Sequence, residues 1–116
     1  MIGPSPEARP CAPPMRLREA GLHGEMARIN REAVRAARRA VGDRALVSAS
    51  VGPSGRLLAP LGDVDPSEVR ESFLAQAAEL ATAGVDLFCV ETMTDLAEAC
   101  LAVEAVRLAA PGVPIV

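Results

Sequence analysis

The segment at residues 84–95, GVDLFCVETMTD, constrains the fold more than any other part of the chain. Its apolar half, residues 85–90, predicts a short strand that is buried on both faces, as parallel strands between helices are. Asp95 and, three residues later, Glu98 form a capping-box pattern, which predicts the start of a helix. Glu91 therefore stands between a buried strand and a capped helix, at the edge of a sheet where α/β proteins bind ligands.

Helices and strands alternate along the rest of the chain. Hydrophobic periodicity predicts amphipathic helices at residues 25–41, 65–83 and 96–110 and a short one at 15–20, and a small-residue strand at 45–51. Residues 113–116 begin a further strand. The faces expected to be buried are Met26, Ile29, Ala33, Ala37 and Ala40 in the first long helix, Val69, Phe73, Ala77 and Leu80 in the second, and Leu96, Ala99, Val103, Val106 and Ala110 in the third.

This alternation indicates an α/β fold of parallel-strand β/α units joined by right-handed crossovers. A (β/α)8 TIM barrel needs about 250 residues, and this chain of 116 would supply about half of one. Residues 1–14 carry five prolines and are expected to be an irregular lead, followed by a partial barrel domain at 15–116. Because the chain ends on a strand that has barely begun, we expect the sequence to be a fragment.

Composition narrows the classes of function. With a net charge of −3, the chain lacks the excess of basic residues that is typical of nucleic-acid-binding proteins. No apolar run is long enough to span a membrane. The three cysteines are an odd number at wide spacings, which is not the pattern of a disulfide framework. Cys89 and Cys100 are expected to be buried, and a reducing cytoplasm is the expected compartment.

Two local patterns have a structural interpretation and a functional one. The glycine loop, residues 51–56, could cradle a phosphate, but it lacks the P-loop pattern, and a structured turn is favoured. The arginines of the helix at 25–41 could form a binding patch, but a solvated face is favoured.

Five segments together resemble the homocysteine S-methyltransferases, in particular the homocysteine-binding domain of the bacterial cobalamin-dependent methionine synthases. They are INREAV at 29–34, VGPSG at 51–55, GVDL at 84–87, VETMTD at 90–95 and EA at 98–99. The resemblance runs in register from about residue 15 to 116. It implies a (β/α)8 barrel in which three cysteine thiolates hold a zinc ion that binds the homocysteine sulfur.

By this resemblance, Glu91 contacts the amino group of homocysteine, and Thr92 is a weaker candidate for substrate binding. No residue of this chain matches a catalytic group. The zinc ligands of the family, which include a Gly-Gly-Cys-Cys segment, lie on later strands and are absent from this chain. Cobalamin is a candidate cofactor of a full-length protein, and the methyl donor is not determined by these residues.

The leading interpretation is a fragment of a zinc-dependent methyltransferase of methionine synthesis, inactive alone. One alternative is a non-catalytic α/β module that packs against a partner or associates with itself through open sheet edges. Another is a different α/β-barrel enzyme that uses Glu91 as an acid or base.

Overall fold

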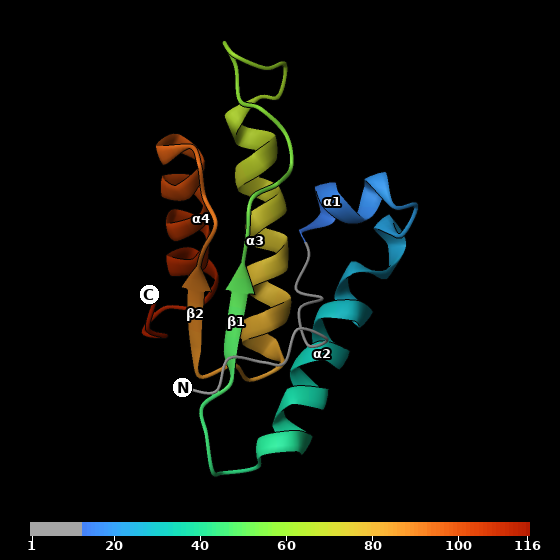
Figure 1. Cartoon of the computed structure of the whole chain (residues 1–116), viewed down its shortest axis with the longest axis vertical. Coiled ribbons are helices and arrows are strands. Elements are labelled where there is room, and N and C mark those ends of the chain that lie inside the picture. The colour runs from blue at the N-terminus through green and yellow to red at the C-terminus, as the bar shows by residue number, and fades with distance from the viewer. Residues whose placement is uncertain (1–12) are drawn as a thin grey trace.

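The computed structural model describes residues 13–116, and within them helices and strands alternate as predicted (Figure 1). The order is α1 (Pro14–Glu19), the 3-10 helix η2 (His23–Glu25), α2 (Met26–Val41), β1 (Ser48–Val51), α3 (Pro66–Thr82), β2 (Leu87–Val90) and α4 (Leu96–Ala109). The described part is thus a mixed α/β fold with a two-stranded parallel sheet and four α-helices, compatible with a fragment of a β/α fold.

The sheet pairs β1 with β2 in parallel, with Ala49 opposite Phe88. The end of the chain adds to it, because Phe88 forms a parallel bridge with Ile115 and accepts a hydrogen bond of 2.9 Å from the amide of Val116. The strand predicted to begin at 113–116 therefore starts to pair beside β2.

Both strands are shorter than predicted, since residues 45–47 and 85–86 lie outside the ladder. The reason lies in Asp86, whose backbone amide donates to Val47 O while its side chain accepts from the amide of Val47 at 2.7 Å. A carboxylate thus takes the place of a backbone acceptor at this end of the sheet.

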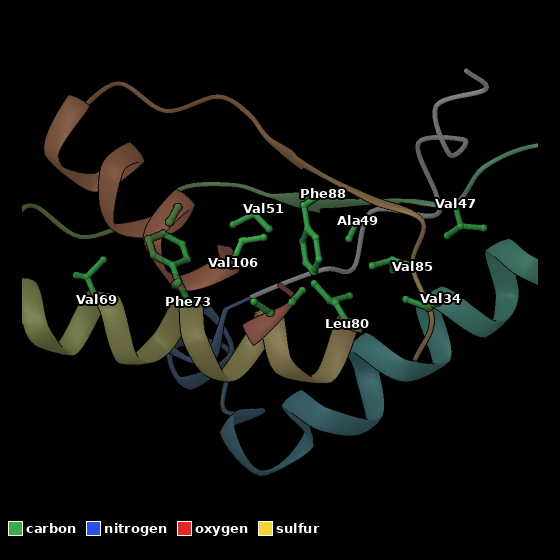
Figure 2. Close-up of a cluster of buried hydrophobic side chains, with 14 of the residues drawn as sticks. Val34, Val47, Ala49, Val51, Val69, Phe73, Leu80, Val85, Phe88 and Val106 are labelled. Carbon is green, nitrogen blue, oxygen red and sulfur yellow. The ribbon is translucent and has the colours of Figure 1, made fainter. Parts of the chain in front are cut away.

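The core lies between the sheet and α3 (Figure 2). Ala49, Val51 and Phe88 point from the sheet toward Phe73 and Leu80 of α3. The face of α3 predicted from periodicity is confirmed, because its four members are at most 1% exposed. The cap predicted for this helix is also confirmed: Asp65 accepts from the amide of Ser67, and Pro66 occupies the first helical position.

The predicted face of α4 is only partly right. Val106 and Ala110 are buried as expected, but Leu96 is 80% exposed, and the buried positions include Glu98, Ala102 and Ala105. Helix α4 contributes Ala102, Ala105 and Val106 to the core, whereas Leu96 and Leu108 are exposed. Periodicity therefore predicted only part of the buried face.

The buried face of helix α2 also differs from the predicted face. Its buried residues are Asn30 and Val34, whereas Ala40 is exposed. Helix α1 begins at Pro14, one residue inside the predicted irregular lead, because proline is tolerated in the first turn of a helix. The rest of that lead, residues 1–12, lies outside the described residues.

The arginines of α2 were predicted to form a solvated face, but Arg38 makes contacts outside the helix. Arg28 and Arg35 pair with acids of neighbouring turns and stay exposed, as expected. Arg38 instead reaches Asp86 at 2.7 Å and Gly84 O at 3.1 Å, tying α2 to the start of β2. Among the helices of the described residues, none is long and apolar enough to cross a membrane.

Candidate functional site

Glu91 directly follows β2, at the carboxyl end of the sheet. Its amide donates to Val51 O at 3.1 Å, which continues the parallel ladder by one bond. Its half-buried side chain accepts a hydrogen bond through Oε1 from the hydroxyl of Ser50. The carboxylate that was predicted to bind substrate is therefore fixed in direction by the neighbouring strand.

Ser50 and Glu91 belong to the sheet face opposite the core. Ser50 lies opposite Cys89, and Ser48 opposite Leu87, in the pairing of β1 with β2. All four side chains are half-buried, because alternation along a strand turns them away from α3. Ser50 was not predicted as a site residue, although the alternation of serine with apolar residues at 48–51 was a signal for one polar face.

Cys89 lies on this face, two residues before Glu91. Partial burial raises the pKa of its thiol, and the negative charge of Glu91 raises that pKa further. Both effects disfavour the thiolate, which is the form that binds metals and acts as a nucleophile. The prediction of a buried Cys89 is half right.

Thr92 has a backbone conformation that β-branched residues rarely adopt. Its φ is +62°, in the left-handed region, and its side chain is exposed. Such a conformation costs about 1–2 kcal/mol in a residue with a Cβ atom. Strained backbone of this kind clusters at binding sites, so its position next to Glu91 agrees with a functional turn.

Helix α4 starts where the sequence predicts, but its cap differs from the predicted capping box. Asp95 accepts from the amide of Ala97 at 2.8 Å, as an N-cap residue does. The side chain of Glu98 instead accepts from the amide and the hydroxyl of Ser54 at 2.7 and 2.6 Å. It binds the glycine loop rather than its own helix.

The glycine loop is a structured turn, as favoured from the sequence. Ser54 is fully buried, and the hydroxyl of Ser54 accepts from the amide of Arg56 at 3.3 Å. Gly55 has φ +86°, which suits a residue without a Cβ atom. Arg16 of α1 donates to Pro53 O at 3.3 Å from the other side. The Ser54 amide is already occupied by a carboxylate, which disfavours the phosphate-cradle interpretation.

The cysteines of the described residues do not form a common site. Cys100 is exposed on α4, contrary to the prediction that it is buried, whereas Cys89 lies on the sheet. Within residues 13–116 no three His, Cys, Asp or Glu residues are grouped as metal ligands. Cys11 lies outside the described residues. The residues described here therefore do not fit the three-thiolate zinc centre that the resemblance implies.

The described residues form an α/β protein with a half-buried carboxylate at the carboxyl edge of a parallel sheet, beside a strained turn and a glycine loop, and α/β proteins bind ligands at this edge. A sequence model of the homocysteine S-methyltransferase family matches residues 8–116. The chain belongs to this family. A comparison with curated proteins finds no match.

Proposed function

We propose that this chain binds homocysteine through Glu91, as part of a methyltransferase of methionine synthesis in the cytoplasm. The observation that carries the proposal is the position of Glu91, half-buried at the carboxyl end of β2 and bonded to Ser50. Membership of the family supports homocysteine as the ligand.

The chemistry of the ligand matches a carboxylate at this position. Homocysteine carries an ammonium group at neutral pH, and removing this group from water is costly unless a charged acceptor receives it. Ser50 bonds to Oε1 of Glu91, so the second oxygen would receive the ammonium. Because the strand end and the hydroxyl already orient the carboxylate, little side-chain entropy is lost on binding. Thr92, next in the chain, would contribute by its exposed hydroxyl.

We further propose that the two strands belong to a (β/α)8 barrel. The half-buried face with Ser48, Ser50, Leu87 and Cys89 would then face the barrel interior, and α3 and α4 would lie outside. A barrel closes with eight strands, so two strands form only one segment of its wall. Methyl transfer would require the remaining strands.

Zinc would bind and activate the sulfur of homocysteine in such an enzyme. Since Cys89 lies in β2 and Cys100 is exposed on α4, residues 13–116 would hold the amino-acid end of homocysteine, and the zinc ligands would come from outside them. The role proposed for this chain is therefore binding and orientation of the substrate. The methyl donor would be bound elsewhere.

Calorimetric titration of L-homocysteine into the wild-type chain and the Glu91→Ala variant tests the proposal. The variant is expected to bind roughly 10- to 150-fold more weakly, because a charge-assisted hydrogen bond contributes about 1.5–3 kcal/mol. Glu91→Gln, which keeps an acceptor and loses the charge, should fall between the two. Glu71→Ala, which removes an exposed carboxylate from α3, is the matched control. Unchanged affinity in Glu91→Ala, with a lower melting temperature, would mean that Glu91 is purely structural.

A second candidate function is self-association, which the outer surface of α4 favours. This α4 surface is a groove of about 500 Å³ whose lining includes Leu96, Ala99, Cys100, Val103, Arg107 and Leu108. Positions 96, 100, 103 and 107 have the 4-3-4 spacing of a coiled-coil seam. Pairing through the edge of β1, the outer strand of the described sheet, is the other route that the sequence suggests.

The occupant that fits the α4 surface is a second copy of the chain. Asp95 caps the first turn of α4, and Arg107 lies in its last turn. In an antiparallel pair of α4 helices, Arg107 of each copy would lie beside Asp95 of the other. The two ends of the surface are thus complementary in charge, and Leu96, Cys100 and Val103 form the apolar part of the seam between them.

A further inference from the structure

Glu98 is a buried carboxylate in the first turn of α4, seven residues after Glu91. It is only 4% exposed, and Ser54, its partner, is fully buried. Both hydrogen bonds from Ser54, of 2.7 and 2.6 Å, end on the same oxygen, Oε1. We call these two residues the Ser54–Glu98 pair.

A buried carboxylate carries a large desolvation cost, so its presence needs a reason. Two features offset the cost here. Both donors make charge-assisted hydrogen bonds, which are stronger than neutral ones. Glu98 is also the third residue after the N-cap Asp95, where the positive end of the helix dipole stabilises a negative charge. The arrangement holds a loop in place, a task that an apolar side chain could not perform.

The loop held in this way is the one that continues from β1 at the edge of the site. Val51, its first residue, accepts the hydrogen bond from the amide of Glu91. Pro53 is held from the α1 side by Arg16, and a Cβ atom on Gly55 would lie 3.2 Å from Nε of the same arginine. The glycine loop is therefore fixed from two sides, by α1 and by α4.

Two serine–glutamate pairs thus join β1 and the glycine loop after it to the segment after β2. Ser50 bonds to Glu91 at the strand ends, and Ser54 bonds to Glu98 seven residues further along the second segment. The turn that contains Thr92 lies between the two glutamates. A movement of the glycine loop would consequently be transmitted to the turn that carries Glu91.

We propose that Glu98 is a positioning residue for homocysteine binding. Through Ser54 it holds the glycine loop and the turn at 91–95 in one arrangement, so that Glu91 meets the ligand already oriented. Glu98 itself does not touch the ligand. This inference rests on the proposed role of Glu91 in binding homocysteine.

The test uses the whole chain and two measurements. Hydrogen exchange at the Ser54 amide reports whether the pair holds the loop, and calorimetric titration of L-homocysteine reports whether the loop matters for binding. In Glu98→Ala the Ser54 amide is expected to exchange about 10-fold faster or more, and homocysteine to bind roughly 5- to 10-fold more weakly. Glu98→Gln keeps an acceptor, so part of the exchange protection at Ser54 and part of the homocysteine affinity should be retained. Glu71→Ala, on the exposed side of α3, should change neither.

Ser54→Ala removes only the hydroxyl and provides the same test if Glu98→Ala does not fold. Unchanged exchange at residue 54 in both Glu98 variants would show that the pair does not hold the loop. Faster exchange with unchanged homocysteine affinity would overturn the positioning role. If the wild-type chain itself binds no homocysteine, the proposal for Glu91 fails, and the positioning role fails with it. The exchange measurement then still decides separately whether Glu98 holds the loop.

Discussion

The hydroxyl of Ser50 in β1 donates a hydrogen bond to the carboxylate of Glu91, the first residue after β2. The two residues are 41 positions apart in the sequence and meet because β1 and β2 are parallel neighbours. The bond fixes one oxygen of Glu91 before any ligand arrives. Since an oriented acceptor loses less entropy on binding, Ser50 should contribute to affinity without contacting the ligand.

Replacing Ser50 by alanine should therefore weaken homocysteine binding less than removing Glu91 does. We expect a loss of roughly 2- to 10-fold, from a hydrogen bond of about 0.5–1.5 kcal/mol. Ser48→Ala is the matched control, because Ser48 lies on the same face of β1, opposite Leu87. Calorimetric titration measures the homocysteine affinity of the wild type, Ser50→Ala and Ser48→Ala. A loss as large in Ser48→Ala as in Ser50→Ala would contradict the role of the Ser50–Glu91 bond.

The positive φ of Thr92 predicts an unusual response to glycine. Thr92→Gly should raise the free energy of unfolding by about 0.5–1 kcal/mol, because relief of the left-handed strain exceeds the freedom that glycine adds to the unfolded chain. Thr94→Gly, two residues on in the same turn, should lower it by about 0.5–1 kcal/mol through the added freedom of the unfolded chain. Urea denaturation measures both changes. Destabilisation by Thr92→Gly would mean that contacts of the threonine side chain outweigh the strain.

The sequence predicted those features that depend on local pattern. Asp65 and Pro66 mark the start of α3, and its large apolar residues point to the core because a single phase of the helix satisfies all of them. The position of Glu91 followed likewise from a strand signal and a helix signal on either side of it.

Features that depend on contacts between distant segments were not predictable. The sequence predicted Glu98 to be part of a capping box. Its carboxylate has a different partner because the fold brings Ser54, which lies 44 residues earlier in the chain, into contact with it. In α4 both helix faces are apolar, so periodicity could not choose the buried one. The left-handed conformation of Thr92 left no signal at all, since threonine disfavours it.

Asp86 should make stability depend on pH in the acidic range. The amide of Val47 and the guanidinium of Arg38 both bond to Oδ2 at 2.7 Å, and they hold the pKa of this carboxyl below its usual value. Because the pKa in the folded state is lowered, the contribution of Asp86 to stability is fully present above about pH 5. It is lost as the pH falls through the folded-state pKa.

Asp86→Asn should accordingly lower the free energy of unfolding at neutral pH by about 1 kcal/mol, because the pair is partly exposed and screened. The difference from the wild type should shrink below about pH 5, as the carboxyl takes up its proton first in the unfolded and then in the folded state. Asp63→Asn is the control, since Asp63 is 86% exposed. Chemical denaturation at several pH values measures this, and a difference independent of pH would show that the charge of Asp86 is not involved.

The α4 surface predicts that the chain associates with itself. The chain has a mass of 12.0 kDa, and light scattering at concentrations on the order of 100 μM should give a larger value. Val103→Glu places a charge in the middle of the seam and should return the chain to a monomer, because burying an unpaired carboxylate is costly. Ala78→Glu puts the same charge on an exposed position of α3 and should leave the association intact.

The ends of the seam test the antiparallel orientation. Arg107→Glu would bring two carboxylates together wherever Arg107 of one copy meets Asp95 of the other, so association should weaken. The same substitution also adds a negative charge to the last turn of a helix, which is unfavourable by itself. Arg39→Glu, in the last turn of α2, carries that second effect alone and should leave the mass unchanged. If light scattering shows that the wild-type chain is a monomer, the proposal of self-association is contradicted. Equal weakening by both arginine variants would show that α4 does not pair in the antiparallel orientation.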